Sequence, residues 1–264
     1  MGDILIDGLP PCAEDLTHQA LVNYGAYTSF RVDDGAARGL DLHLARLARA
    51  GRDLFGDAAP EVELRRLMRL AVAGRQACWL RVSLFSPEIG HRAPSWAGRP
   101  RVMTAVFPPP PPLADAVRLT TLAYEREAPQ LKHVATFGLI QARRQARAAG
   151  FDDALFVTRD GRVSEGTLWN IGFVEGDRIV WPQAPMLEGV TQAVLRDELA
   201  RAGAPQETRA IPVEALGDFD GAFLCNSATP VCPVTAIDGR AYDPQAVPVE
   251  TLRSAWAAAP LQAI

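Results

Sequence analysis

The chain contains a single lysine, Lys132, among its 27 basic residues, and every other basic residue is arginine. A lysine amine can form a Schiff base with an aldehyde cofactor, whereas the arginine guanidinium stays protonated and cannot serve as that amine. Genomic bias toward arginine explains most of this composition, but it does not explain why one lysine remains. Taken alone, the observation leaves two interpretations open: a lysine with a chemical role, or an incidental surface residue.

A carboxylate and two turns could serve the same chemistry. Glu165 ends a predicted hairpin strand, where it could keep a pyridine nitrogen protonated or be only a strand-end charge. Gly189-Val190-Thr191 runs into a predicted helix, so its amides and hydroxyl could bind an anion, with simple N-capping by Thr191 as the alternative. Ser227-Ala228-Thr229 follows an apolar strand, at a strand end where ligands commonly bind. Together these are the components of a pyridoxal-phosphate (PLP) site.

Arg46 could add a cation to such a site. It follows His43 on a predicted helix that begins at Leu40 and carries apolar residues at helical spacing. A lone arginine on such a helix is usually solvated, so Arg46 gains weight only in combination with the other residues.

Apolar spacing and turn residues predict the elements that must position these side chains. In the first part of the chain, strands are predicted at 4–6, 26–32 and 79–85 and helices at 40–54 and 64–72. In the second part we predict helices at 137–149 and 191–202, hairpins at 154–165 and 170–181, and a strand at 222–227. The sum is an α+β chain.

The run Pro108 to Pro112 divides the chain better than any other stretch, because consecutive prolines favour extended geometry and donate no backbone hydrogen bonds. We therefore predict a small N-terminal α/β domain (1–107), a proline-rich linker (108–114) and a larger C-terminal domain that binds the cofactor (115–264).

Composition indicates a globular protein that binds small molecules. The chain is 48% hydrophobic and 22% charged, with a formal net charge of -4 and no basic stripe of the kind nucleic-acid binding requires. Its first residues are acidic where a signal peptide needs basic ones, and their apolar stretch is too short to span a bilayer, so we expect a cytoplasmic protein without membrane contact. The four cysteines lack CxxC spacing; we expect reduced thiols and no metal site.

Eight segments carry a resemblance to a known family and follow the family's order over nearly the whole chain. They are Tyr27–Val32, His43–Leu47, Leu131–His133, Gly150–Leu155, Val163–Gly166, Asn170–Ile171, Leu187–Thr191 and Cys225–Val234. The chain thereby resembles the class IV aminotransferases of PLP fold type IV. That family includes branched-chain and D-amino-acid aminotransferases, (R)-amine transaminases and 4-amino-4-deoxychorismate lyase.

The resemblance implies a role for each candidate residue. Lys132 would carry PLP as a Schiff base and shuttle the proton, and Glu165 would pair with the pyridine nitrogen. The cofactor phosphate would be bound by Arg46, by the amides of Val190 and Thr191, and by Ser227. The candidates for the substrate pocket are Tyr27, Arg81 and the amide of Ala228.

The activity that the resemblance implies is transamination between an amino acid and a 2-oxo acid, by a homodimer. Many transaminases of the family carry tyrosine five positions after the lysine, where this chain has Phe137. The lyase branch also lacks that tyrosine, and its motifs resemble Lys132-His133 and Cys225-Asn226. The alternative is therefore a lyase that releases pyruvate from aminodeoxychorismate with the same lysine. A relative that binds PLP without turnover is a third possibility.

Overall fold

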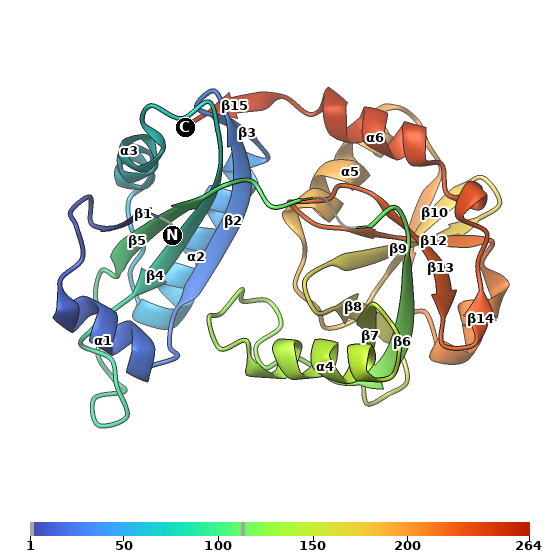
Figure 1. Cartoon of the computed structure of the whole chain (residues 1–264), viewed down its shortest axis with the longest axis horizontal. Helices are drawn as coiled ribbons and strands as arrows, with labels where there is room; N and C mark the ends of the chain where they lie inside the picture. The colour runs from blue at the N-terminus through green and yellow to red at the C-terminus, as the bar shows by residue number, and fades with distance from the viewer. Residues whose placement is uncertain (1–2, 112–113) are drawn as a thin grey trace. The chain divides into compact units, whose positions relative to one another are not determined.

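The computed structural model describes residues 3–111 and 114–264, and its chain divides into two compact units (Figure 1). The first unit comprises Met1–Pro111, Leu131–Ala135 and Pro260–Ile264, and the second comprises Pro112–Gln130 and Thr136–Ala259. The segment with Lys132 and the last five residues thus group with the N-terminal residues, whereas the sequence places both in the larger C-terminal domain. The predicted domain bounds stay a prediction, and residues 112–113 of the predicted linker lie outside the described residues.

The first unit is built on a six-stranded antiparallel sheet in the order β1-β5-β4-β2-β3-β15. The hairpin between β2 and β3 turns at Asp34 and Gly35, which have φ values of 47° and 74°, and two positive φ values in succession suit the twist of a two-residue hairpin. Figure 1 shows β15 lying beside β3, so the last strand of the chain completes this sheet. The strands are β1 (Asp3–Ile6), β2 (Ala26–Asp33), β3 (Ala36–Arg38), β4 (Ala77–Phe85), β5 (Arg101–Phe107) and β15 (Leu261–Ala263).

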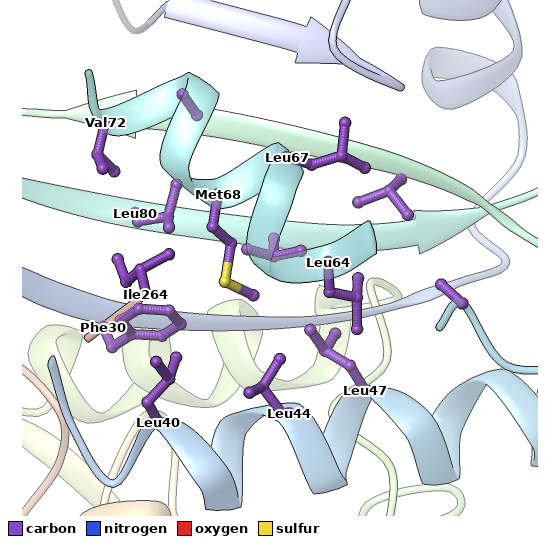
Figure 2. Packing of buried hydrophobic residues seen from close by; sticks show 14 of the residues in the cluster. Phe30, Leu40, Leu44, Leu47, Leu64, Leu67, Met68, Val72, Leu80 and Ile264 are labelled. Carbon is purple, nitrogen blue, oxygen red and sulfur yellow. The ribbon is translucent and has the colours of Figure 1, made fainter. Parts of the chain in front are cut away.

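Two amphipathic helices, α2 (Leu40–Phe55) and α3 (Glu61–Val72), form the core of this unit with the sheet. Figure 2 shows their apolar side chains pointing toward one another, with Phe30 of β2 and Leu80 of β4 between them. A third helix, α1 (Ala13–Leu21), is absent from the sequence prediction. Its only buried residue is Asp15, so it has no buried apolar stripe from which periodicity could reveal it.

The second unit contains a nine-stranded sheet in the order β11-β10-β9-β12-β13-β6-β7-β8, with β14 paired to β13. An additional pairing, Glu165 with Asn170, joins β8 to β9 and closes a ring of six strands. The ring encloses a core of buried apolar residues that includes Leu155, Phe173 and Leu224. Its strands are β6 (Val117–Ala123), β7 (Asp153–Val157), β8 (Val163–Gly166), β9 (Asn170–Glu175), β12 (Gly221–Cys225) and β13 (Cys232–Ile237).

The remaining elements of this unit cover or extend the ring. Helix α4 packs Leu139, Ala142 and Ala146 against β7, and helices α5 and α6 share a second apolar cluster with Trp181 and Phe223. These elements are α4 (Phe137–Ala148), α5 (Val190–Arg201), α6 (Val249–Ala258), β10 (Arg178–Pro182), β11 (Gln206–Arg209), β14 (Arg240–Ala241) and the 3-10 turns Val213–Asp218 and Pro244–Ala246.

The predicted α+β class is confirmed, as are both hairpins of the second unit. Helices α4 and α5 lie within one residue of their predicted bounds at each end. No helix of the described part of the chain is long and apolar enough to span a membrane. All four cysteines are free thiols, and burial raises the pKa of Cys225 to about 12 and that of Cys232 to about 11.

Candidate functional site

In the first unit, the segment that carries Lys132 pairs with the start of β2. The Tyr27 amide donates to the Lys132 carbonyl at 2.9 Å, and the Val134 amide donates to the Gly25 carbonyl at 2.9 Å. A side chain on Gly25, whose φ is +158°, would lie 2.4 Å from the Leu84 carbonyl oxygen. The backbone of Lys132 is therefore fixed against a strand rather than carried on a free loop.

The Lys132 side chain is half-buried and lies beside an aromatic ring that a second cation also contacts. Its Nζ is 5.0 Å from the centroid of the Tyr27 ring, and Arg81 Cζ is 3.7 Å from the same centroid. Attraction between a cation and the ring face stabilises both contacts. Arg81 Nε donates to Ser83 Oγ at 3.3 Å, and burial lowers the pKa of the Arg81 guanidinium. Lys132, Tyr27 and Arg81 thus form one cluster.

Helix α2 places His43 and Arg46 inside the unit rather than on a solvated face. His43 is 1% exposed and Arg46 is 8% exposed. Thr28 Oγ1 and His43 Nδ1 are 2.6 Å apart, and the His43 ring lies 4.4 Å from that of Phe30. Burial, with the charges of Arg46 and Lys132, lowers the pKa of His43 well below its ordinary 6.5, so His43 is neutral at pH 7.

In the second unit, Glu165 is buried at the point where β8 and β9 close the ring of strands. Its Oε1 accepts from the Leu187 amide at 2.9 Å, and Arg126 Nε is 3.9 Å from the same oxygen. Both side chains of this ion pair are buried, with 5% of Arg126 and 6% of Glu165 exposed. A carboxylate held in this way is oriented and kept from bulk water.

In the loop that leads into α5, the backbone of Leu187 contacts both Glu165 and Asn170. Asn170 Nδ2 donates to the Leu187 carbonyl at 2.9 Å, while the Leu187 amide bonds Glu165. Gly189 is the N-cap residue of α5, and a Cβ there would lie 2.0 Å from Asn170 Oδ1. A side chain at Gly189 would therefore require Asn170 to move, and glycine avoids this clash at the helix start.

The start of α5 presents donors that the protein itself does not use fully. Thr191 is 1% exposed, and its hydroxyl has no hydrogen-bond partner within the described ranges. α5 has 12 residues, so its N-terminal amides and dipole favour an anion at this end. The Thr191 hydroxyl is not an N-cap, because Gly189 occupies that position and Val190 begins the helix.

A third segment of the second unit, the turn at 226–229, is ordered by Asn226. Its Oδ1 accepts from the amides of Ala228 and Thr229 at 2.9 and 2.8 Å, and its Nδ2 donates to the Leu168 carbonyl at 3.4 Å. Ser227 and Ala228 are half-buried in this turn. The turn is thereby connected to residues 166–169, which directly follow Glu165.

The structure brings the predicted site residues together in two groups. In the first unit, Lys132 and Arg81 contact the Tyr27 ring, and Arg46 and Lys132 act on the charge of His43 on α2. In the second unit, the predicted residues lie on connected segments: Glu165, Val190, Thr191, Ser227 and Ala228. Sequence reasoning missed Arg126, since an arginine in a loop gives no signal of burial.

Phe137 begins α4 and is 80% exposed. Among residues 3–111 and 114–264, no cluster of three or more His, Cys, Asp or Glu side chains could hold a metal ion.

Comparison with known proteins points to one family. The family model described as amino-transferase class IV matches residues 25–237. The chain is 26% identical over 236 residues to a putative branched-chain-amino-acid aminotransferase of Methanocaldococcus jannaschii, covering 84% of this chain and 82% of the relative. It is 27% identical over 244 residues to the aminodeoxychorismate lyase of Bacillus subtilis, covering 86% and 82%.

Solved structures agree on the fold. A fold IV-transaminase from Curtobacterium pusillum matches with a TM-score of 0.72 at 25% identity, covering 90% of this chain and 84% of that one. A hypothetical aminotransferase from Mycobacterium tuberculosis, in its PLP-bound form, matches with a TM-score of 0.78 at 24% identity, covering 98% of both chains. The predicted fold type IV is therefore confirmed, and PLP is the cofactor of this family.

The residues present fit PLP. The phosphate requires donors at a helix start. The start of α5 offers the buried Thr191 hydroxyl, which has no partner among the described residues, close to Gly189, where a Cβ would clash with Asn170. The pyridine nitrogen requires a buried carboxylate, which Glu165 is.

Proposed function

The chain belongs to the class IV aminotransferase family, and on that premise we propose that it is a PLP-dependent transaminase, which moves an amino group between an amino acid and a 2-oxo acid. One observation carries the proposal: the only lysine of the chain is half-buried, fixed to β2 and placed beside Tyr27 and Arg81. An incidental surface lysine would not need this backbone pairing.

We propose that the candidate residues hold PLP, which when bound supplies an electron sink for the carbanion left by proton removal. Arg46, the amides of Val190 and Thr191, and Ser227 bind the phosphate; the unpartnered Thr191 hydroxyl supports this assignment. Glu165 keeps the pyridine nitrogen protonated, and its fixed orientation through the Leu187 amide supports that role.

Lys132 has two tasks in this proposal. Its amine would bond the aldehyde carbon of the cofactor with loss of water, and as a free amine it would accept the α-proton of the substrate and donate it to that cofactor carbon. His43, which is neutral at pH 7, does not add a further positive charge beside this amine. Tyr27, Arg81 and the Ala228 amide contact the substrate, with the guanidinium of Arg81 suited to a carboxylate.

The test is the visible absorption spectrum of the purified protein before and after addition of L- and D-amino acids. A transaminase gives a yellow protein whose band one amino acid bleaches, and the handedness of that amino acid identifies the substrate series. A protein that binds no PLP would overturn the proposal. A yellow protein that no amino acid bleaches would exclude transamination but leave the cofactor assignment in place.

A lyase that releases pyruvate from aminodeoxychorismate is the second candidate. Phe137 supports it, because this position carries no hydroxyl. The motifs Lys132-His133 and Cys225-Asn226 and the likeness to the Bacillus subtilis lyase support it too. Pyruvate release measured on aminodeoxychorismate separates the two. The homodimer and the cytoplasmic location stay predictions, to be checked by sedimentation and by cell fractionation.

A further inference from the structure

Asp153, the first residue of β7, is a buried carboxylate outside the set of residues assigned above. It is 4% exposed. Its Oδ1 accepts from Thr167 Oγ1 at 2.7 Å, its Oδ2 accepts from Trp169 Nε1 at 3.0 Å, and Arg143 Nε lies 3.3 Å from Oδ2. Burial of a carboxylate is unfavourable unless such donors surround it, so this arrangement is specific to the folded chain.

The Ala154 amide also donates to Asp153 Oδ1, at 2.8 Å. The two side-chain donors, Thr167 and Trp169, belong to residues 166–169, the connection between Glu165 of β8 and Asn170 of β9. The Gly166 amide donates to the Trp169 carbonyl at 2.9 Å. A Cβ on Gly166 would lie 2.2 Å from Cζ2 of Trp169, so the indole packs directly on the backbone of the turn. Asp153 thus fixes this connection from the neighbouring strand. Glu165 and Asn170, which pair across β8 and β9, flank the connection on its two sides.

The same connection contacts two other segments assigned to the cofactor. The Leu168 carbonyl accepts from Asn226, which orders the turn with Ser227 and Ala228. Asn170 bonds the Leu187 carbonyl, and the Leu187 amide bonds Glu165. A shift of residues 166–169 would therefore be transmitted to Glu165, to the start of α5 and to the turn at 226–229.

From these contacts we propose that Asp153 is a positioning residue, whose carboxylate holds the 166–169 connection and through it sets the orientation of Glu165 and of the Asn226 turn toward the cofactor. The effect on the cofactor rests on the proposed function, whereas the hydrogen-bond network is present in the chain without cofactor.

Asp153→Asn is the informative substitution, because it replaces one carboxylate oxygen by an NH2 group and leaves the side-chain volume almost unchanged. The amide oxygen still accepts from Thr167, but the amide nitrogen faces Trp169 Nε1 and Arg143 Nε, which are donors as well. The control is Asp152→Asn, an exposed neighbour whose side chain accepts from the Arg118 amide at 2.7 Å and retains an acceptor after the change.

Two readouts separate positioning from general stability. In the cofactor-free protein, hydrogen exchange of the Gly166, Leu187 and Ala228 amides should be faster by about tenfold in Asp153→Asn, as the loss of one buried charge-assisted bond implies, with no change in Asp152→Asn. With PLP, affinity should fall by about tenfold and the visible band should shift, both measured without urea, where each variant is folded.

Trp169→Phe removes the same hydrogen bond from the other side and should change exchange and spectrum in the same direction. The double variant should add little to Asp153→Asn, since both remove one interaction. Wild-type exchange at the three amides in Asp153→Asn would overturn the inference, whether or not PLP binds, and so would wild-type affinity with an unshifted band. If wild-type protein itself binds no PLP, the proposed function fails, and the exchange measurement still decides whether Asp153 orders the network.

Discussion

The two units present their candidate site residues by different means. In the first unit, side chains pack on one another: Lys132 and Arg81 lie against the Tyr27 ring, and Arg46 lies near a buried, neutral His43. In the second unit, backbone amides and amide side chains form a connected set of hydrogen bonds from Asn170 through Leu187 to Glu165. The first group depends on which side chains are present, and the second on where the backbone lies.

This difference determines what each group tolerates. Replacing a side chain in the first unit removes a chemical group but leaves β2 paired with the Lys132 segment through the backbone. Adding a single Cβ at a close approach in the second unit moves several groups at once, since interiors are packed at crystal-like density. The following predictions test whether the two groups respond in these two ways.

The largest effect is expected for Lys132→Ala, which removes the amine that bonds the cofactor and moves the proton. Turnover should fall by about 10⁴-fold or more, because both covalent attachment and proton transfer are lost. Steady-state kinetics measures the loss, and circular dichroism should show the fold of the wild type. Lys132→Arg is the control that keeps the positive charge without a competent amine, and it should be as inactive. Normal turnover in either variant would exclude the mechanism.

The next effect is that of Glu165, where charge and hydrogen bonding can be separated. Glu165→Ala should slow turnover by about 100-fold, because the ionic partner of the pyridine nitrogen is lost, while the fold stays intact. Glu165→Gln keeps an acceptor for the Leu187 amide and should preserve the order of that loop, yet remain slow. The two variants should differ in hydrogen exchange at Leu187 and agree in a shifted visible band. An unshifted band in both would show that Glu165 does not contact the pyridine nitrogen.

Most of the site residues that the sequence could predict were predicted from their residue types. Lys132, Arg46 and Glu165 were predicted from their chemistry and family motifs. Helices α4 and α5 of the second unit were predicted, whereas α6 was not. Asp153 and Arg126 were not, because their significance arises only when β7, β8 and the loop before Lys132 lie together. The sequence signal for Asp153 is weak: a carboxylate opens the buried run Ala154-Leu155-Phe156, which marks the residue as unusual without naming its partners.

The sequence also could not show how the site segments are tied to one another. Gly189 was predicted as part of an anion-binding loop, but the reason for glycine is its distance to Asn170, which no local pattern contains. Likewise, the Lys132 segment groups with the first unit through pairing with β2, and that pairing is between parts of the chain far apart in sequence. Contacts of this kind depend on tertiary structure rather than on propensity.

Gly189→Ala tests the second group directly. Its Cβ would lie 2.0 Å from Asn170 Oδ1, so the Asn170 side chain must move and weaken its bond to Leu187. Stability should fall by about 2 kcal/mol, as overpacking typically causes, and PLP affinity should fall with it. Gly239→Ala is the matched control, because nothing lies within 4 Å of a Cβ there. The test is urea unfolding and PLP titration of both variants. Equal free energies of unfolding and equal PLP affinities would show that the loop before α5 accommodates the added Cβ without loss.

The smallest effect concerns His43 in the first group, where loss of a side chain should change pH dependence more than structure. Its folded-state pKa lies well below the ordinary 6.5 because of burial, Arg46 and Lys132, so below that pH protons bind the unfolded chain preferentially. The stability is therefore fully present above about pH 6.5 and is lost as pH falls below it. Between pH 7.5 and 5.5, His43→Gln should lose less free energy of unfolding than the wild type, as measured by urea unfolding at each pH. Equal pH dependence in His43→Gln and the wild type would mean that His43 takes up its proton in the folded state, and the first group would then have to accommodate a further cation.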